Sequence, residues 1–272
     1  MAPTYGYKVD PRTRTEPDGT VIDLLAQDRK YETGLRPFLA TASTGDVDLT
    51  PFCTDQNQLN LSSCAGNGTV ESLEILNNIA GYKRTPLSRL FVYALARNEE
   101  EDPANPGHTM LERDEGTYIR STFDVLSRYG VCDEYIWPYD PSKVFTSPSL
   151  MAQRQALGHK IHSYYRIAST GEDRVAEVIS ALRQNHPVVF GTKIGPSFQR
   201  LVGPGPVGPP TGVTIGGHCM VVVGFVGGMF IIKNSWGTGW GDKGCCLFTP
   251  EYLAWEDTAD LWVPTLGMDF SV

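Results

Sequence analysis

The sequence predicts an α+β fold in which helices precede strands. Between Cys64 and Tyr82 apolar residues recur at steps of three or four, the spacing of one buried helix face. After about residue 160, β-branched runs broken by glycine replace that spacing. Helices and antiparallel strands that occupy separate parts of a chain are typical of α+β domains.

Three helices are predicted in the first half of the chain. The first covers 64–82, and the second covers 87–101 with Ser88 as its N-cap. The third covers 117–129 and ends at Gly130, because glycine readily adopts the left-handed conformation that closes a helix.

Strands dominate the prediction for the second half. One amphipathic helix, 173–185, interrupts them, and the glycine- and proline-rich stretch 203–212 is predicted to be a loop. The predicted strands are 163–167, 187–191, 220–225, 229–233 and 245–248.

Composition limits the function classes. The 272 residues suffice for one large domain or two modest lobes, and 41% of them are hydrophobic, as in ordinary globular proteins. The net charge of −8 argues against nucleic acid as a partner. No apolar run is long enough to predict a membrane span, and no secretory signal is visible at the N-terminus. The expected location is the cytoplasm, or the outside by a signal-independent route.

The chain divides into three predicted segments. Residues 1–50 are rich in proline, threonine, aspartate and glycine and are expected to form an extended arm. Residues 51–160 form a mainly helical lobe, and residues 161–272 form a mainly β lobe. The two lobes together are expected to make one domain.

Cys64 is the candidate nucleophile. A thiol attacks as the thiolate, and the positive end of the helix that Cys64 begins favours that form. No C-x-x-C pair occurs among the cysteines, so neither a zinc site nor any other metal site is expected. An odd number of cysteines remains beside Cys64, and the cysteines are expected to be mostly or wholly reduced.

His218 and Asn234 are the candidate partners of that thiol. Two glycines lead into His218, which begins an apolar strand, and Asn234 follows the next strand. An asparagine oxygen that accepts a bond from the imidazole holds the ring, so that its other nitrogen faces the sulfur. Trp236 is expected to cover this bond and to border the substrate site.

The block from Lys233 to Gly241 reads Lys-Asn-Ser-Trp-Gly-Thr-Gly-Trp-Gly. With Cys64 and His218 upstream, the chain resembles the papain-like cysteine peptidases, as a bacterial-type member without a full helical pro-region. The resemblance spans about residues 50–265. It implies a two-lobed papain-like fold, with a helical N-terminal lobe and an antiparallel β-barrel-like C-terminal lobe that enclose the active site.

Two glutamines compete for the oxyanion role. In the family a glutamine precedes the nucleophile with five residues between, a spacing that selects Gln58. Gln56 follows Asp55, as in the Asp-Gln pair of many bacterial relatives, but needs a two-residue insertion. Gln58 is preferred, and Gln56 stays open.

Three further positions are compared with the family pattern. Gly116 resembles the family's glycine that pairs with substrate backbone, although a simple helix start would also explain it. Ala65 replaces the usual aromatic residue after the nucleophile, and Cys219 follows the histidine in place of glycine or alanine. Both departures imply a differently shaped cleft wall.

The resemblance implies a cysteine endopeptidase that hydrolyses peptide or protein substrates through a thioester, without metal or organic cofactor. Two alternatives stay open: acyl transfer to an amine, as in a peptide ligase or transglutaminase-like enzyme, and a non-catalytic peptide-binding module. A further hypothesis is that the arm of residues 1–50 occupies the cleft and restrains activity.

Overall fold

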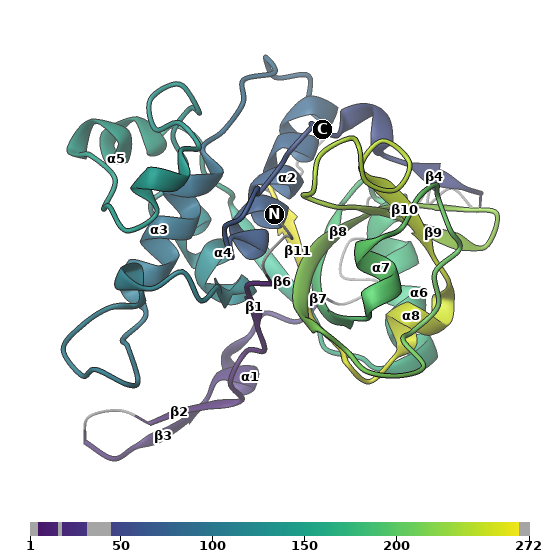
Figure 1. Ribbon diagram of the computed structural model, residues 1–272, viewed down its shortest axis with the longest axis horizontal. Coiled ribbons are helices and arrows are strands. Elements are labelled where there is room, and N and C mark those ends of the chain that lie inside the picture. Colours follow the sequence, from purple (N-terminus) through teal and green to yellow (C-terminus); the bar gives the residue numbers. More distant parts are fainter. Residues whose placement is uncertain (1–4, 16–17, 32–44, 267–272) are drawn as a thin grey trace, which may run out of the picture.

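The computed structural model describes residues 5–15, 18–31 and 45–266. Within these ranges, helices gather on one side of the molecule and a sheet with its own helices on the other (Figure 1). The predicted arm is described only in part, because residues 1–4, 16–17 and 32–44 lie outside the described ranges. No helix in the described ranges is long and apolar enough to cross a bilayer.

The first lobe is built from helices. Ser88 caps α3 by accepting a hydrogen bond from the N–H of Phe91 at 3.2 Å, as its place before the apolar run predicted. Gly130, with φ of +79°, follows α4 as predicted. The helices are α2 (Cys64–Ile79), α3 (Arg89–Glu99), α4 (Ile119–Arg128) and α5 (Leu150–Ala156), with the 3₁₀ turns η1 (Thr50–Phe52), η2 (Met110–Glu112) and η3 (Pro141–Lys143).

The second lobe is an antiparallel sheet in the order β10-β9-β8-β7-β11-β6, with β4 paired to β8. No pairing joins β6 to β10 in the described part of the chain, so the sheet stays open and does not close into a barrel. The strands are β4 (Val47–Asp48), β6 (Ser163–Ile167), β7 (Val188–Ile194), β8 (Gly216–Val226), β9 (Met229–Lys233), β10 (Cys245–Phe248) and β11 (Thr258–Thr265).

Short helices accompany the sheet. The amphipathic helix predicted at 173–185 is α6 (Gly171–Arg183), which buries Val178 and Leu182. Two shorter helices, α7 (Pro196–Gln199) and α8 (Pro250–Ala254), start with proline, whose missing N–H costs a helix nothing at that position.

Helix α2 joins the two lobes. Its residues from Cys64 to Leu76 are buried, because α3 and α4 pack on one side and β8 on the other. A Cβ on Gly68 would lie 3.2 Å from the sulfur of Cys219 in β8. Gly68 lowers the helix propensity of α2, but its lack of a side chain lets the sheet approach the helix closely.

The N-terminal segment runs between the lobes. Strand β1 (Tyr7–Lys8) pairs in parallel with β5 (Thr117–Tyr118), which directly precedes α4. Further along, β2 (Thr13–Thr15) and β3 (Val21–Asp23) form a hairpin that projects from the body of the molecule, followed by α1 (Leu24–Gln27) (Figure 1). The predicted extended arm thus contains short regular elements.

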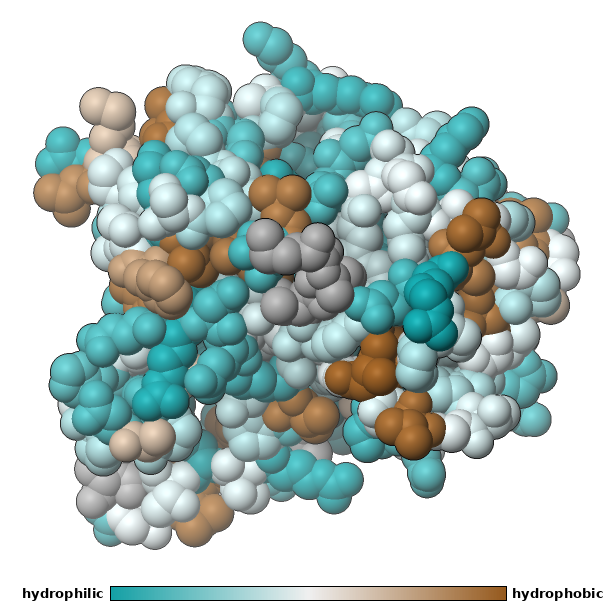
Figure 2. Space-filling model, viewed as in Figure 1, coloured by the Kyte–Doolittle hydropathy of each residue, from teal (hydrophilic) through white to brown (hydrophobic). Residues whose placement is uncertain are grey.

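Apolar side chains on the surface are dispersed. On the face shown in Figure 2 the brown residues form small groups separated by teal and white ones. The most exposed ones are Val202 and Val213, at 92% and 81% exposure, which flank the glycine- and proline-rich loop. The core therefore accounts for most of the large apolar residues, as in ordinary globular domains.

Candidate active site

Cys64 is the first residue of α2 and has no exposed surface. Backbone N–H groups of Cys219 and Gly6 face its sulfur and lower the pKa of the thiol, but burial outweighs them and raises that pKa to about 11. In the described structure Cys64 is therefore a neutral thiol, held between the start of its own helix, strand β8 and the N-terminal segment.

His218 lies on β8, one residue before Cys219, and is also fully buried. Its Nε2 donates to Oδ1 of Asn234 at 2.8 Å, and the backbone N–H of Ser235 donates to the same oxygen at 2.8 Å. Burial lowers the pKa of His218 to about 4, although the bond to Asn234 opposes that shift. The ring is neutral with its proton on Nε2, which leaves Nδ1 as the basic nitrogen.

Nδ1 of His218 has no hydrogen-bond partner among the residues that the structure describes. Cys219, whose N–H faces the sulfur of Cys64, directly follows His218 in β8. No hydrogen bond joins Nδ1 of His218 to that sulfur in the described part of the chain.

Trp236 covers the bond between His218 and Asn234. Its ring stacks on the imidazole with centroids 4.6 Å apart and 29° between the planes. The rings of Phe198 and Trp240 also pack against the indole of Trp236, with ring centroids 5.6 and 5.4 Å from its centroid. This aromatic group keeps water from the bond and strengthens it by lowering the local dielectric constant.

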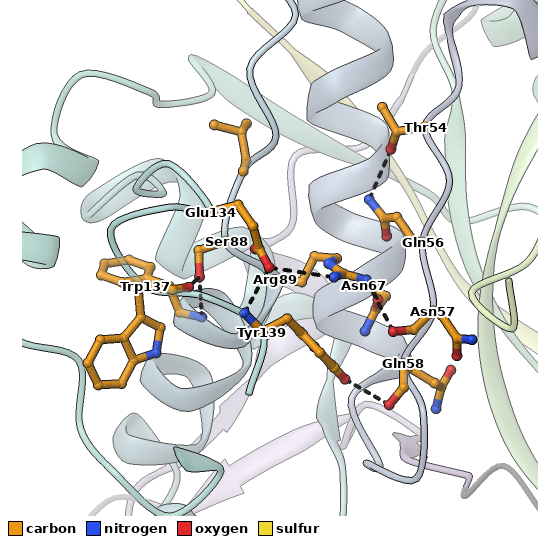
Figure 3. Close-up of polar contacts among 12 residues, drawn as sticks. Thr54, Gln56, Asn57, Gln58, Asn67, Ser88, Arg89, Glu134, Trp137 and Tyr139 are labelled. Atoms are coloured by element: carbon orange, nitrogen blue, oxygen red, sulfur yellow. Dashed lines mark hydrogen bonds and ion pairs between the residues drawn. The ribbon is translucent and has the colours of Figure 1, made fainter. Parts of the chain in front are cut away.

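The two candidate glutamines point to different partners. Gln58 is fully buried, and its Oε1 accepts from the hydroxyl of Ser235 at 2.6 Å, next to Asn234. Its Nε2 donates to the carbonyl of Leu61 at 2.8 Å. Gln56 instead directs Nε2 to Glu74 at 3.1 Å and toward Thr54, as Figure 3 shows for the second contact. Gln58 is thus the glutamine beside the candidate site.

The N-terminal segment fills the space around these groups. The ring of Tyr5 lies edge-on to His218 and to Trp236, with centroids 6.4 and 6.3 Å away. The carbonyl of Gly6 accepts from the N–H of Thr117 at 3.0 Å. A Cβ on Gly6 would lie 1.7 Å from the carbonyl oxygen of Ser62, so only glycine fits there.

Gly116 borders the same segment. Its φ is +83°, a left-handed conformation that favours glycine, and a Cβ there would lie 1.8 Å from the carbonyl oxygen of Gly6. Its N–H donates to the hydroxyl of Tyr93 at 3.2 Å. Gly116 and Thr117 therefore form a backbone edge, and the arm occupies that edge in the described structure.

Tyr7 enters a pocket in the β lobe. Its ring fills the space that a side chain on Gly191 would need, since a Cβ there would lie 2.1 Å from the ring. Its hydroxyl donates to Asp260 at 2.6 Å, and the N–H of Asp10 donates to the same carboxylate oxygen at 2.8 Å.

Buried ion pairs hold Asp10 and Asp28 of the arm. Arg120 of α4 donates to Asp10 at 2.6 Å and pairs with Asp28. Arg166 of β6 donates to Asp28 at 3.1 Å and to Asp260 at 3.3 Å. Two arm carboxylates thus complete a cluster whose other charges come from both lobes.

The sequence did not indicate Ser235 or Asp260 as site residues, and the hypothesis that the arm occupies the cleft singled out neither Tyr5 nor Gly6. The sequence could have indicated Ser235, since it lies between Asn234 and Trp236 in the block from Lys233 to Gly241. It could not have indicated Asp260, because the position of that residue depends on tertiary pairing. No group of His, Cys, Asp and Glu placed to hold a metal ion occurs in the described ranges, and all six cysteines are free thiols.

Comparison with known proteins places the chain in a family. The family model described as papain family cysteine protease matches residues 50–252. An uncharacterised peptidase C1-like protein of Acanthamoeba polyphaga mimivirus is 33% identical over 229 residues, which cover 80% of this chain and 71% of the viral protein.

Solved structures of cysteine proteases are also similar to this chain. Xylellain, a cysteine protease from Xylella fastidiosa, is 27% identical with a TM-score of 0.77, and the match covers 97% of this chain and 96% of xylellain. Bromelain protease from Ananas comosus, in complex with the E64 inhibitor, shares the fold at 19% identity and a TM-score of 0.62, over 82% of this chain and 99% of bromelain. The chain belongs to the papain family of cysteine proteases.

Proposed function

We propose that this hydrolase is an endopeptidase in which Cys64 is the nucleophile and His218 the general base. The bond from His218 Nε2 to Asn234 Oδ1, at 2.8 Å, carries the proposal, because it leaves Nδ1 free to take the proton of the thiol. Asn234 is the orienting residue. Trp236 shields its bond to His218.

The reaction begins when the arm leaves the cleft and water reaches the site. Without the arm the thiol and the imidazole are less buried, so the ion pair of thiolate and imidazolium costs less. The thiol proton moves to Nδ1 of His218, and the thiolate sulfur bonds to the carbonyl carbon of the substrate. The developing oxyanion accepts hydrogen bonds from the amide of Gln58 and the backbone N–H of Cys64.

The tetrahedral adduct then collapses to a thioester. The carbon–nitrogen bond breaks, and the imidazolium gives its proton to the leaving amine. His218 next takes a proton from water, whose oxygen attacks the thioester, and the sulfur leaves as the second product forms. Substrate backbone lies along the edge of Gly116 and Thr117 in this proposal, because the arm uses the same edge.

Product analysis tests the endopeptidase assignment. The full chain is incubated with an unstructured protein, with and without an added primary amine, and the products are identified by mass spectrometry. Internal cleavage that is lost in Cys64→Ala supports the proposal. Products joined to the amine in preference to water would assign acyl transfer, and peptide binding without any product would assign a binding module.

A further inference from the structure

Two buried glutamates of α2 face the segment that carries Gln58. Glu71 and Glu74 are one helix turn apart and are 2% and 5% exposed. Glu71 accepts from the backbone N–H of Thr54 at 2.8 Å, and Glu74 accepts from the backbone N–H of Leu87 at 2.7 Å. None of the proposed catalytic steps uses either carboxyl group.

The hydroxyl of Thr54 lies between the two carboxyl groups. Its oxygen is 2.7 Å from Oε2 of Glu71 and 2.6 Å from Oε2 of Glu74. A threonine hydroxyl has one proton and can donate to only one of these oxygens. The second short contact therefore needs another proton, which a protonated carboxyl group supplies.

The remaining contacts decide which carboxyl group holds that proton. Glu74 accepts from Leu87 and from Nε2 of Gln56 at 3.1 Å, so donors from three residues surround it once Thr54 donates to it. Glu71 accepts one backbone N–H, from Thr54, and its only other donor besides Thr54 among the described contacts is the thiol of Cys53, a weak one. Because donors stabilise the ionised form, the proton belongs on Glu71 and the negative charge on Glu74.

The surrounding charges are consistent with a proton on Glu71 and a negative charge on Glu74. Burial is the main reason that the pKa of Glu71 is raised to about 7, and the charge of Glu74 is the second. Lys233, just before Asn234 in the chain, lowers the pKa of Glu71, and Arg89 lowers that of Glu74. The thiols of Cys53 and Cys245 face Glu71, and Asp55 pairs with Lys233 at 3.6 Å. On its other side Glu74 lines a pocket that also contains ionisable side chains, those of Tyr82, Lys83, Arg84, His159 and Lys160.

The same segment is tied to the catalytic block at its other side. The carbonyl of Gln56 accepts from the N–H of Gly237 at 2.9 Å, and the N–H of Gln58 donates to the carbonyl of Ser235 at 2.8 Å. Figure 3 shows Gln56 directed at Thr54 and Gln58 further along, where its carbonyl accepts from Tyr139. The 54–58 segment is thus fixed between α2 and the block that contains Asn234.

We propose that Glu71 keeps a proton in the folded enzyme and donates it to Thr54, and that this contact positions the 54–58 segment and with it Gln58. Glu71 and Glu74 are positioning residues, since neither touches substrate. When Glu71 ionises, Thr54 stands between two anions and the segment shifts. The catalytic consequence rests on the proposed role of Gln58, whereas the proton on Glu71 does not.

The dependence of kcat on pH tests the catalytic part. In the unsubstituted protein kcat should fall as pH rises through about 7, by about 10-fold or more, since removing an oxyanion donor costs about 10²–10³-fold. KM should change little, because only transition-state binding is lost. Glu71→Gln keeps a donor to Thr54 at every pH and should abolish this inflection. Glu172→Gln, an exposed change of the same charge, is the control.

Hydrogen exchange tests the positioning without any activity. Amide exchange in peptides covering 54–58, corrected for intrinsic rates, should accelerate between pH 6 and 8 in the unsubstituted protein and in Glu172→Gln but not in Glu71→Gln. Equal protection at both pH values, or parallel profiles in all three proteins, would overturn the proposal. If no peptide is turned over but the exchange pattern appears, the proposed function fails and the role of Glu71 in positioning the segment stands.

Discussion

A single backbone N–H fixes the orientation of the Asn234 side-chain amide. Ser235 donates its N–H to Oδ1 of Asn234, which identifies that atom as the oxygen and places the proton of His218 on Nε2. The hydroxyl of the same serine holds Oε1 of Gln58. One residue thus orients both the base and the proposed oxyanion donor.

Ser235→Ala separates the effect on Gln58 from the effect on Asn234, since it removes the hydroxyl and keeps the backbone N–H. Oε1 of Gln58 then loses the hydroxyl that donates to it, and we expect kcat to fall about 10- to 100-fold with KM nearly unchanged. Ser235→Thr, which retains a hydroxyl, should recover most of the rate. A rise in KM at constant kcat would show instead that Ser235 acts on substrate binding.

His218 makes stability depend on pH on the acid side. Its pKa in the folded protein is about 4, below the ordinary 6.5, so the unfolded chain binds more protons between these values. The free energy of unfolding should therefore fall as pH drops from 6.5 to 4, by up to about 3 kcal/mol from this residue. Urea midpoints measured across this range should fall more steeply in the unsubstituted protein than in His218→Gln. Parallel curves would contradict the burial of a neutral ring.

At the scale of elements, helices with a clear period were predictable and the last strand was not. The spacing predicted α2 from Cys64 onward, and it ends at Ile79, two residues before Gly81 with φ of +75°. Strand β11 contains Asp260 and Pro264, which argue against a strand locally. Its pairing with β6 and β7 overrides that preference.

The same strand shows why Asp260 was missed as a site residue. The register of β11 against β7 shifts between Ala259 and Trp262, and Asp260 within this irregularity has φ of +50°. Such irregularities re-aim a side chain, here to the hydroxyl of Tyr7. No local pattern in the sequence encodes a contact of this kind between segments 253 residues apart.

The arm is the element whose removal should change activity most. Deleting residues 1–45 should raise turnover if the arm restrains the enzyme, because the segment around Gly6 covers Cys64 and the edge at Thr117. In the full chain, Tyr7→Ala should act in the same direction, since it removes the bond to Asp260. Val9→Ala, at a residue that is 62% exposed, is the matched control. Unchanged turnover in a folded deletion variant would refute the restraint.

At the scale of the whole molecule, the sequence predicted the chemistry better than the surroundings of the site. Cys64, His218 and Asn234 stand in motifs whose spacing is local, so their residue types and order were readable. Their burial was not, because it comes from Tyr5 and Gly6 crossing from the N-terminal end of the chain. The contact between α2, which begins at Cys64, and β8, which carries His218, depends likewise on tertiary packing.

The rate at which a thiol-directed epoxide inhibitor alkylates each cysteine tests the central claim most directly. The reaction is run on the full chain carrying Tyr7→Ala and mapped by mass spectrometry, with and without the additional change His218→Ala. We expect Cys64 to react far faster than Cys53 or Cys132, and we expect this advantage to disappear without His218. A rate at Cys64 no higher than at Cys53, or one that survives the loss of the imidazole, would contradict it.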